Sequence, residues 1–77
     1  METMGMNPKE IGKRLVRLRG SMSQEDVSNS IGISTSALSM YERGERIPRD
    51  SIKIRISAFY NEPIQDIFYP EITRNVK

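Results

Sequence analysis

The sequence predicts an all-α fold, a compact bundle of five short helices. Apolar residues recur at steps of three and four positions through most of the chain, which is the period of a helix buried on one side. Helix-capping residues precede these segments, and Gly, Asn or Pro residues follow them. In the window 24–43 the apolar spacing is interrupted at Gly32, so two short helices must meet there at a tight turn.

The first helix is predicted to begin after Asn7, its N-cap, with Pro8 at the first helical position. Gly20 ends it. Its buried stripe, spaced by four and three residues, is expected to consist of Ile11, Leu15 and Leu18. Val16 lies off that stripe and is expected to be partly exposed.

The second and third helices are predicted on either side of Gly32, which can adopt the positive φ that the turn needs. Ser23 is the expected N-cap of the second helix, and Ser34 that of the third. The third helix should run to about Arg43 and stop at Gly44. This arrangement is a helix-turn-helix, and the second helix of that motif is the kind that enters the DNA major groove.

A fourth helix is predicted to begin at Arg49 or Asp50 and to stop at Asn61. Its alternating isoleucines would also fit a strand, but the acidic start and the Asn stop favour a helix. One face of it should carry Ile52, Ile56, Phe59 and Tyr60. Pro63 opens a short fifth helix, and Pro70 ends it.

The length of 77 residues fits one domain, with a disordered leader over 1–6, a folded domain over 7–69 and a tail over 70–77. Without Cys or His, neither a disulfide nor a zinc site is expected, so oligomerisation is the expected reinforcement of a small core. No apolar run approaches the ~20 residues of a membrane span. A cytoplasmic protein without membrane contact is therefore expected.

Basic residues form two clusters, and the segment 20–42 between them contains no Lys or Arg. The clusters are Lys9, Lys13, Arg14, Arg17 and Arg19, and then Arg43, Arg46, Arg49, Lys53 and Arg55. A neutral reading surface between basic segments suits a DNA-binding protein that holds phosphates on either side of the bases. Alternatively, the basic residues simply solvate exposed helix faces.

The outward face of the third helix is predicted to contact base edges through Thr35, Ser36, Ser39 and Met40. Hydroxyl groups both donate and accept hydrogen bonds, so they discriminate weakly between bases. Apart from Arg43 at its end, this helix offers no Arg, Asn or Gln for a bidentate purine contact. Modest base discrimination with a larger share from DNA shape is expected. Alternatively, the hydroxyls merely solvate a surface helix.

With these elements placed, the chain resembles the phage-repressor (Cro-like or XRE-like) helix-turn-helix family over about 11–68. The segments that carry the resemblance are IGKRL (11–15), LR (18–19), SQE (23–25), IGIS (31–34), YERGERIP (41–48) and IQDIF (64–68). The fifth of these matches the family's E-R-G-x-x-x-P signature. The resemblance implies a lambda-repressor-like DNA-binding domain.

The chain departs from the family pattern at three places. The connection from Arg19 to Ser23 is shorter than usual, and Pro63 stands where the family has a capping Ser or Thr. Ser28 stands where the family normally has Ala. Its hydroxyl is expected to donate to the carbonyl four residues earlier, which would preserve the close helix–helix contact.

The resemblance also implies roles for individual residues. Gln24, at the start of the second helix, would bond a DNA phosphate and brace the recognition helix. Arg19 and Glu42 would form a partly buried, bidentate ion pair with a structural role. Separately, the charge pattern predicts that Arg43, Arg46 and Arg49 contact DNA phosphates. Lys13 and Arg14 are weaker candidates for such contacts.

The C-terminal end carries more apolar surface than so small a bundle can easily cover. A two-fold interface is predicted there from Ile64, Phe68, Tyr69 and Ile72. Alternatively, Ile64 and Phe68 complete the monomer core, which is an equally good explanation for those two residues.

The leading hypothesis is a sequence-specific transcriptional regulator, bacterial or phage-encoded, that represses by binding a palindromic operator as a homodimer. Its partner is double-stranded DNA. The alternative is an antitoxin or adaptor whose main partner is another protein. An enzyme is not expected, because the carboxylates are scattered and no glycine-rich phosphate loop precedes a helix. No cofactor, metal or small-molecule substrate is expected.

Overall fold

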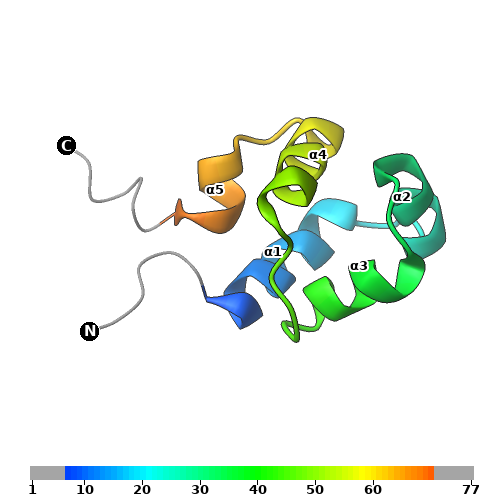
Figure 1. Cartoon of the computed structure of the whole chain (residues 1–77), viewed down its shortest axis with the longest axis horizontal. Coiled ribbons are helices and arrows are strands. Elements are labelled where there is room, and N and C mark those ends of the chain that lie inside the picture. The colour runs from blue at the N-terminus through cyan, green and yellow to red at the C-terminus, as the bar shows by residue number, and fades with distance from the viewer. Residues whose placement is uncertain (1–6, 71–77) are drawn as a thin grey trace.

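The computed structural model describes residues 7–70, and this part of the chain contains five helices and no strand. They are α1 (Pro8–Arg19), α2 (Gln24–Ile31), α3 (Thr35–Glu42), α4 (Asp50–Tyr60) and α5 (Ile64–Phe68) (Figure 1). The predicted all-α class and the order of the helices are confirmed. The predicted leader 1–6 and residues 71–77 of the predicted tail lie outside the described residues.

The predicted helix boundaries are confirmed by the capping geometry. Asn7, Ser23 and Ser34 each accept backbone N–H groups two or three residues further on, at 3.0–3.2 Å. These side chains satisfy N–H groups that have no partner inside the helix. At the other ends, Gly32 (φ 90°) after α2 and Asn61 (φ 54°) after α4 adopt the left-handed conformation that stops a helix.

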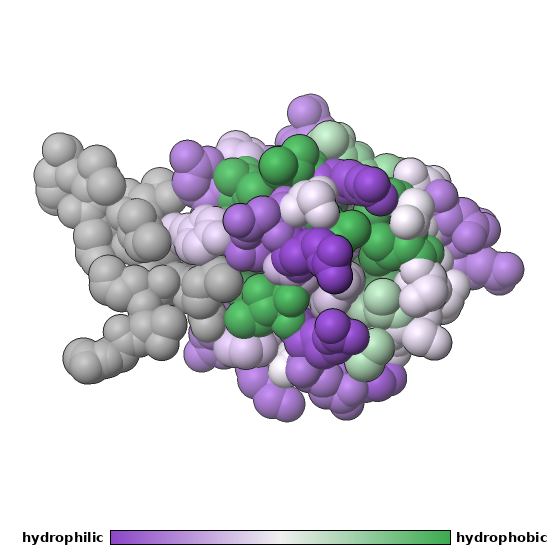
Figure 2. Space-filling model, viewed as in Figure 1, coloured by the Kyte–Doolittle hydropathy of each residue, from purple (hydrophilic) through white to green (hydrophobic). Residues whose placement is uncertain are grey.

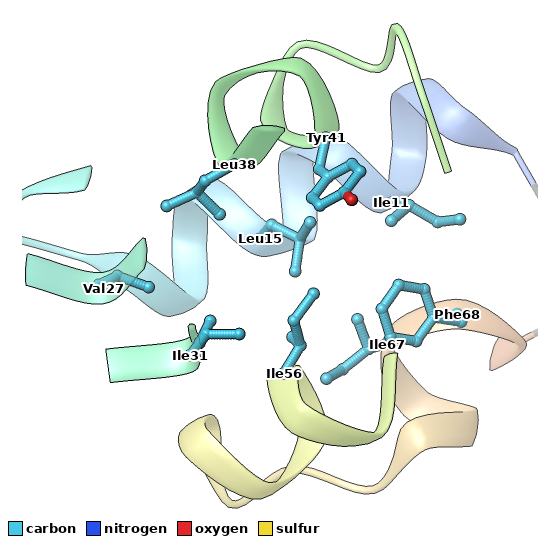
Figure 3. Close-up of a cluster of buried hydrophobic side chains, with 9 residues drawn as sticks. All are labelled: Ile11, Leu15, Val27, Ile31, Leu38, Tyr41, Ile56, Ile67 and Phe68. Carbon is cyan, nitrogen blue, oxygen red and sulfur yellow. The ribbon is translucent and has the colours of Figure 1, made fainter. Parts of the chain in front are cut away.

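The core lies where all five helices meet, and its side chains point into one space between α1, α3 and α4 (Figure 3). It consists of Ile11, Leu15, Val27, Ile31, Leu38, Tyr41, Ile56, Ile67 and Phe68. Leu18, Ile52, Phe59 and Tyr60, which the helical spacing assigned to the core, pack against its margin and are partly buried. Val16 and Ile54 are exposed, as their positions off the buried stripes predict.

Helices α1 and α3 approach each other closely at Gly12, which is buried. A Cβ atom at this position would lie 2.4 Å from the backbone carbonyl oxygen of Glu42. That separation is far inside van der Waals contact, and the obstacle is backbone at the end of α3. The absence of a side chain at residue 12 therefore sets how closely the first helix can support the third.

Lys53 is buried, although it belongs by sequence to the second basic cluster. Its ammonium group lies 2.8 Å from the Tyr69 hydroxyl and 3.4 Å from Asp50 Oδ1. It also lies over the rings of Phe68 and Tyr69, at 5.7 and 5.1 Å from their centres. The expectation that Lys53 helps to anchor phosphate is therefore wrong. The residue fastens α4 to the end of α5, because its apolar stem and its charge both find partners there.

We predict that Gly12→Ala lowers the free energy of unfolding by about 1–3 kcal/mol, because the added methyl group pushes α1 away from α3. Urea unfolding followed by circular dichroism measures the change. Lys13→Ala, at the next and exposed position of α1, is the matched control and should leave stability nearly unchanged. A Gly12→Ala protein as stable as this control would contradict the close approach described here.

Candidate nucleic-acid interface

The four side chains predicted to contact bases lie together on the outer face of α3. They line one open groove of about 370 Å³ whose lining residues are Gln24, Thr35, Ser36, Ser39, Met40 and Arg43. The opposite side of α3 buries Leu38 and Tyr41 in the core, so the helical period leaves this face outward. Their contact with bases stays a prediction, but the groove brings these residues and two predicted phosphate contacts onto one surface.

The carboxylate of Glu42 joins the first three helices. Arg19 donates to it twice, from Nε to Oε2 at 2.7 Å and from Nη2 to Oε1 at 3.1 Å. Gln24, the first residue of α2, donates from Nε2 to Oε1 at 2.8 Å. The side chain of Glu42 is 3% exposed and that of Arg19 is 20% exposed. Three donors thus compensate the burial of one negative charge at the end of α3.

The arginine of this pair makes one more contact, which the sequence did not indicate. Arg19 donates from Nη1 to the backbone carbonyl of Met22 at 2.7 Å, across the short turn between α1 and α2. Its hydrogen bond with Glu42, opposed by burial and helped by the carboxylate charge, raises the pKa of Arg19 above its ordinary value. The guanidinium group therefore holds α3 and the first turn of the chain at the same time.

Gln24 was expected to face a DNA phosphate, and in the free protein one N–H of its amide is already bonded to Glu42. The amide nitrogen has a second N–H, and the side chain also lines the groove beside α3. The same residue is thus placed both to brace α3 and to reach a ligand in the groove.

A pair of hydroxyl groups links α2 to the start of α3. Ser28 Oγ lies 3.0 Å from Thr35 Oγ1 and donates to the backbone carbonyl of Glu25 at 3.1 Å. The expectation that Ser28 donates to the carbonyl four residues earlier is therefore wrong. The hydroxyl turns to the carbonyl three residues earlier, where it can also meet Thr35. Sequence spacing alone could not reveal this contact, because its two residues lie on different helices.

Arg43 is engaged by two neighbours at the open end of the groove. It forms a bidentate pair with Glu45, with both nitrogen–oxygen distances 3.0 Å, and donates from Nη1 to Ser39 Oγ at 2.6 Å. The hydrogen bonds between Arg43 and Glu45, helped by the attraction of their charges, raise the pKa of Arg43 and lower that of Glu45. Both side chains are about half exposed, so water and salt weaken the pair. A phosphate could therefore replace Glu45 at little cost.

The remaining basic residues divide by their contacts. Arg46 and Arg49, in the loop after α3, are exposed and form no ion pair with any residue of 7–70. Arg14, by contrast, donates from Nε to the backbone carbonyl of Ile67 at 2.7 Å and so fastens α1 to α5. Of the weaker candidates for phosphate contact, Arg14 has a structural task.

The predicted dimer residues at the C-terminal end do not form one exposed patch. Phe68 is fully buried and Ile64 packs against the core, because α5 folds back over α1 and α4. The prediction that Phe68 faces a partner is therefore wrong. The alternative is correct for this residue: Phe68 completes the monomer core. Tyr69 is partly buried beside Lys53, and Ile72 lies outside the described residues.

The Tyr60 hydroxyl is buried near the pair of Arg19 and Glu42 and has no hydrogen-bond partner among the described residues. Burial and the charge of Glu42, opposed by Arg19, raise the pKa of Tyr60 to about 12. The phenol therefore stays protonated well above the range in which a free tyrosine ionises.

A helix-turn-helix family model matches residues 5–67 of the chain. No curated protein and no solved structure matches the chain. Within residues 7–70, no group of three or more acidic, His or Cys side chains could hold a metal ion. In the same part of the chain every helix is too short or too polar to cross a bilayer.

We predict that Arg19→Met destabilises the fold by about 3 kcal/mol, because it leaves the buried Glu42 carboxylate with Gln24 as its remaining partner. Urea unfolding measures the effect. The double variant Arg19→Met/Glu42→Met should recover most of the loss, since it removes the unpaired charge as well. The exposed Arg43→Ala is the control for losing an arginine, and an equal effect of both single variants would contradict the importance of the buried pair.

We predict a pH dependence of stability that comes from Tyr60. Its pKa is raised from 10 to about 12 on folding. The stability that the neutral phenol contributes to the folded protein is therefore fully present below pH 10 and is lost as the pH rises from 10 through 12. Absorbance at 295 nm should show one tyrosine ionising near pH 12 that is missing from Tyr60→Phe. The same variant should lose less stability between pH 9 and 11 than wild type. If the absorbance difference between wild type and Tyr60→Phe titrated at pH 10, the raised pKa of Tyr60 would be refuted.

Proposed function

The chain belongs to the Cro/XRE-like helix-turn-helix family of DNA-binding transcription regulators, and on that premise we propose that it represses transcription by occupying a palindromic operator as a homodimer. In this proposal α3 of each protomer enters the major groove. The observation that carries it is the single groove along α3, lined by the hydroxyls, the methionine and the Gln24 and Arg43 side chains. Hydroxyls and a methionine suit contacts with base edges, and the Gln24 and Arg43 side chains can donate to phosphates.

The base-reading part of the proposal assigns Thr35, Ser36, Ser39 and Met40 to base edges. Single hydroxyl contacts discriminate less than the bidentate contacts of Arg, Asn or Gln. One α3 of eight residues therefore reads a half-site weakly. Two copies held one helical turn of DNA apart, about 34 Å, multiply that discrimination, which is the physical reason for proposing a dimer.

The phosphate-binding part of the proposal uses contacts from two elements that meet near the end of α3. Gln24, at the start of α2, is bonded to Glu42 there and also lines the groove. Arg43, Arg46 and Arg49 follow, where α3 ends and the next loop begins. Because Arg46 and Arg49 are exposed and form no ion pair within residues 7–70, they can bind phosphate without breaking such a pair there.

The dimer part of the proposal rests on Tyr69 and Ile72, since Phe68 is committed to the monomer core. Tyr69 follows α5 directly and is partly buried, so a partner could cover its remaining surface. On the face shown in Figure 2, apolar surface is divided into separate patches by polar and charged residues. This pattern favours a small interface at the end of the bundle over a broad apolar one on that face.

An antitoxin or adaptor that binds mainly another protein is the alternative. Its support was the apolar C-terminal end, and the burial of Phe68 reduces that surface. A partner protein that co-purifies in equal amount would favour this alternative, whereas sedimentation of a pure homodimer that binds DNA would favour the repressor.

The proposal is tested by a gel-shift titration against the intergenic DNA beside the gene, with random DNA of equal length as competitor. We expect binding to one inverted repeat that is at least tenfold tighter than to random DNA at physiological salt. Equal affinity for both would overturn sequence-specific regulation. A complex that contains one protomer per repeat would overturn the homodimer.

We predict that Arg46→Ala and Arg49→Ala each weaken binding to operator and random DNA alike. Each should lower the slope of log K against log salt concentration by about 0.9, the contribution of one phosphate contact. Arg17→Ala is the matched control, since Arg17 lies beside Glu62 and Asp66 and away from the groove of α3. An unchanged slope in both loop variants would remove them from the interface.

A further inference from the structure

Ser28 is a fully buried polar residue that makes no contact with the outside, yet its hydroxyl meets the first residue of α3. Ser28 Oγ lies 3.1 Å from the Glu25 carbonyl oxygen and 3.0 Å from Thr35 Oγ1. Thr35 itself is exposed and lines the groove assigned to DNA. The buried serine is therefore in direct contact with a group that is predicted to read a base.

Counting protons assigns the direction of both hydrogen bonds. Each hydroxyl has one proton, and a carbonyl oxygen can only accept. The contact with Glu25 is a hydrogen bond only if Ser28 donates, which uses its proton. The contact with Thr35 is then a hydrogen bond only if Thr35 donates to Ser28. Because Ser28 is shielded from solvent, no water can take over either role, and an unmade bond here would be costly.

Because the Thr35 hydroxyl donates its proton to Ser28, its oxygen presents only lone pairs to the groove. In the major groove, the hydrogen-bond donors are the amino groups of adenine and cytosine, whereas guanine O6 and N7 and thymine O4 are acceptors. An acceptor facing another acceptor is repulsive, so this hydroxyl discriminates although a free hydroxyl would not.

We propose that Ser28 is a specificity-determining residue that fixes Thr35 as a hydrogen-bond acceptor and makes it select adenine or cytosine. The inference rests on the proposed function, because it requires α3 to enter the major groove. Ser28 touches no base and acts as a positioning residue through Thr35. Ser39 shows the opposite arrangement: it accepts from Arg43, so its own proton stays available to donate.

Selection of binding sites from a randomised DNA pool tests the proposal with the full chain. Thr35→Val keeps the shape of the side chain and removes its hydroxyl. The DNA position at which this variant loses base preference is therefore the position that Thr35 reads. At that position wild type should favour adenine or cytosine over guanine or thymine by about three- to tenfold. Ser28→Ala frees the Thr35 proton and should reduce this preference to about twofold or less.

Ser30→Ala is the matched control, because Ser30 is an exposed serine on the same helix as Ser28 and does not line the groove. It should leave the preference at the Thr35 position unchanged. An identical preference in wild type and Ser28→Ala would overturn the inference while leaving the proposed function intact. A wild-type protein that enriches no sequence would overturn the proposed function, and base selection by Thr35 with it.

A measurement without DNA tests the hydrogen bond itself. Three-bond couplings from the Thr35 methyl carbon to the backbone nitrogen and carbonyl carbon report its χ1 rotamer. We expect one rotamer in wild type and averaging among rotamers in Ser28→Ala, with the backbone chemical shifts of the core unchanged. Averaging already in wild type would overturn the proposal, since the hydroxyl would then not be held.

Discussion

The position of α3 depends on the contacts of the buried Glu42 carboxylate. Glu42 ends α3, and its bonds to Arg19 and Gln24 join that helix to α1 and to the start of α2. Burial of a charge is unfavourable unless donors surround it, so this group is stable only while all three helices keep their places. The bare backbone of Gly12 lets α1 come close enough to the same end of α3. An ionic junction and a close backbone contact thus hold the end of α3, in addition to the burial of Leu38 and Tyr41 in the core.

The groove along α3 takes its chemical character from residues behind and beside it. Ser28 sets the direction of the Thr35 hydroxyl from inside, and Arg43 sets that of Ser39 from the rim. Gln24 divides its amide between Glu42 and the groove. A surface made of hydroxyls would read bases poorly if each hydroxyl could turn freely. Fixed partners restrict that freedom at Thr35 and Ser39, so the hydrogen-bonding character of this face depends on the buried Ser28 and on Arg43 as well as on the hydroxyls themselves.

The far end of the bundle solves a different problem, which is to close a small core. Phe68 fills the space between α1 and α4, and Lys53 covers its ring with a cation while bonding Tyr69. Arg14 fastens α5 to α1 through the Ile67 carbonyl. These basic side chains serve the fold, whereas Arg46 and Arg49 keep their charges in solvent next to α3. Some basic side chains therefore stabilise α5, whereas others lie in solvent close to the groove.

The sequence by itself determined most of what depends on neighbours within about one helical turn, although it did not give the acceptor of the Ser28 hydroxyl. The five helices, the caps Asn7, Ser23 and Ser34, the turn at Gly32 and the outward row from Thr35 to Met40 all follow from local spacing and backbone preference. The tertiary structure alone decided the contacts between helices: the burial of Lys53 and Phe68, the second partner of Ser28 and the enclosure of the Tyr60 hydroxyl. A residue type and its period say which way a side chain leaves its own helix. They do not say which atoms of another helix it will meet, because that distance is set by the packing of the whole core.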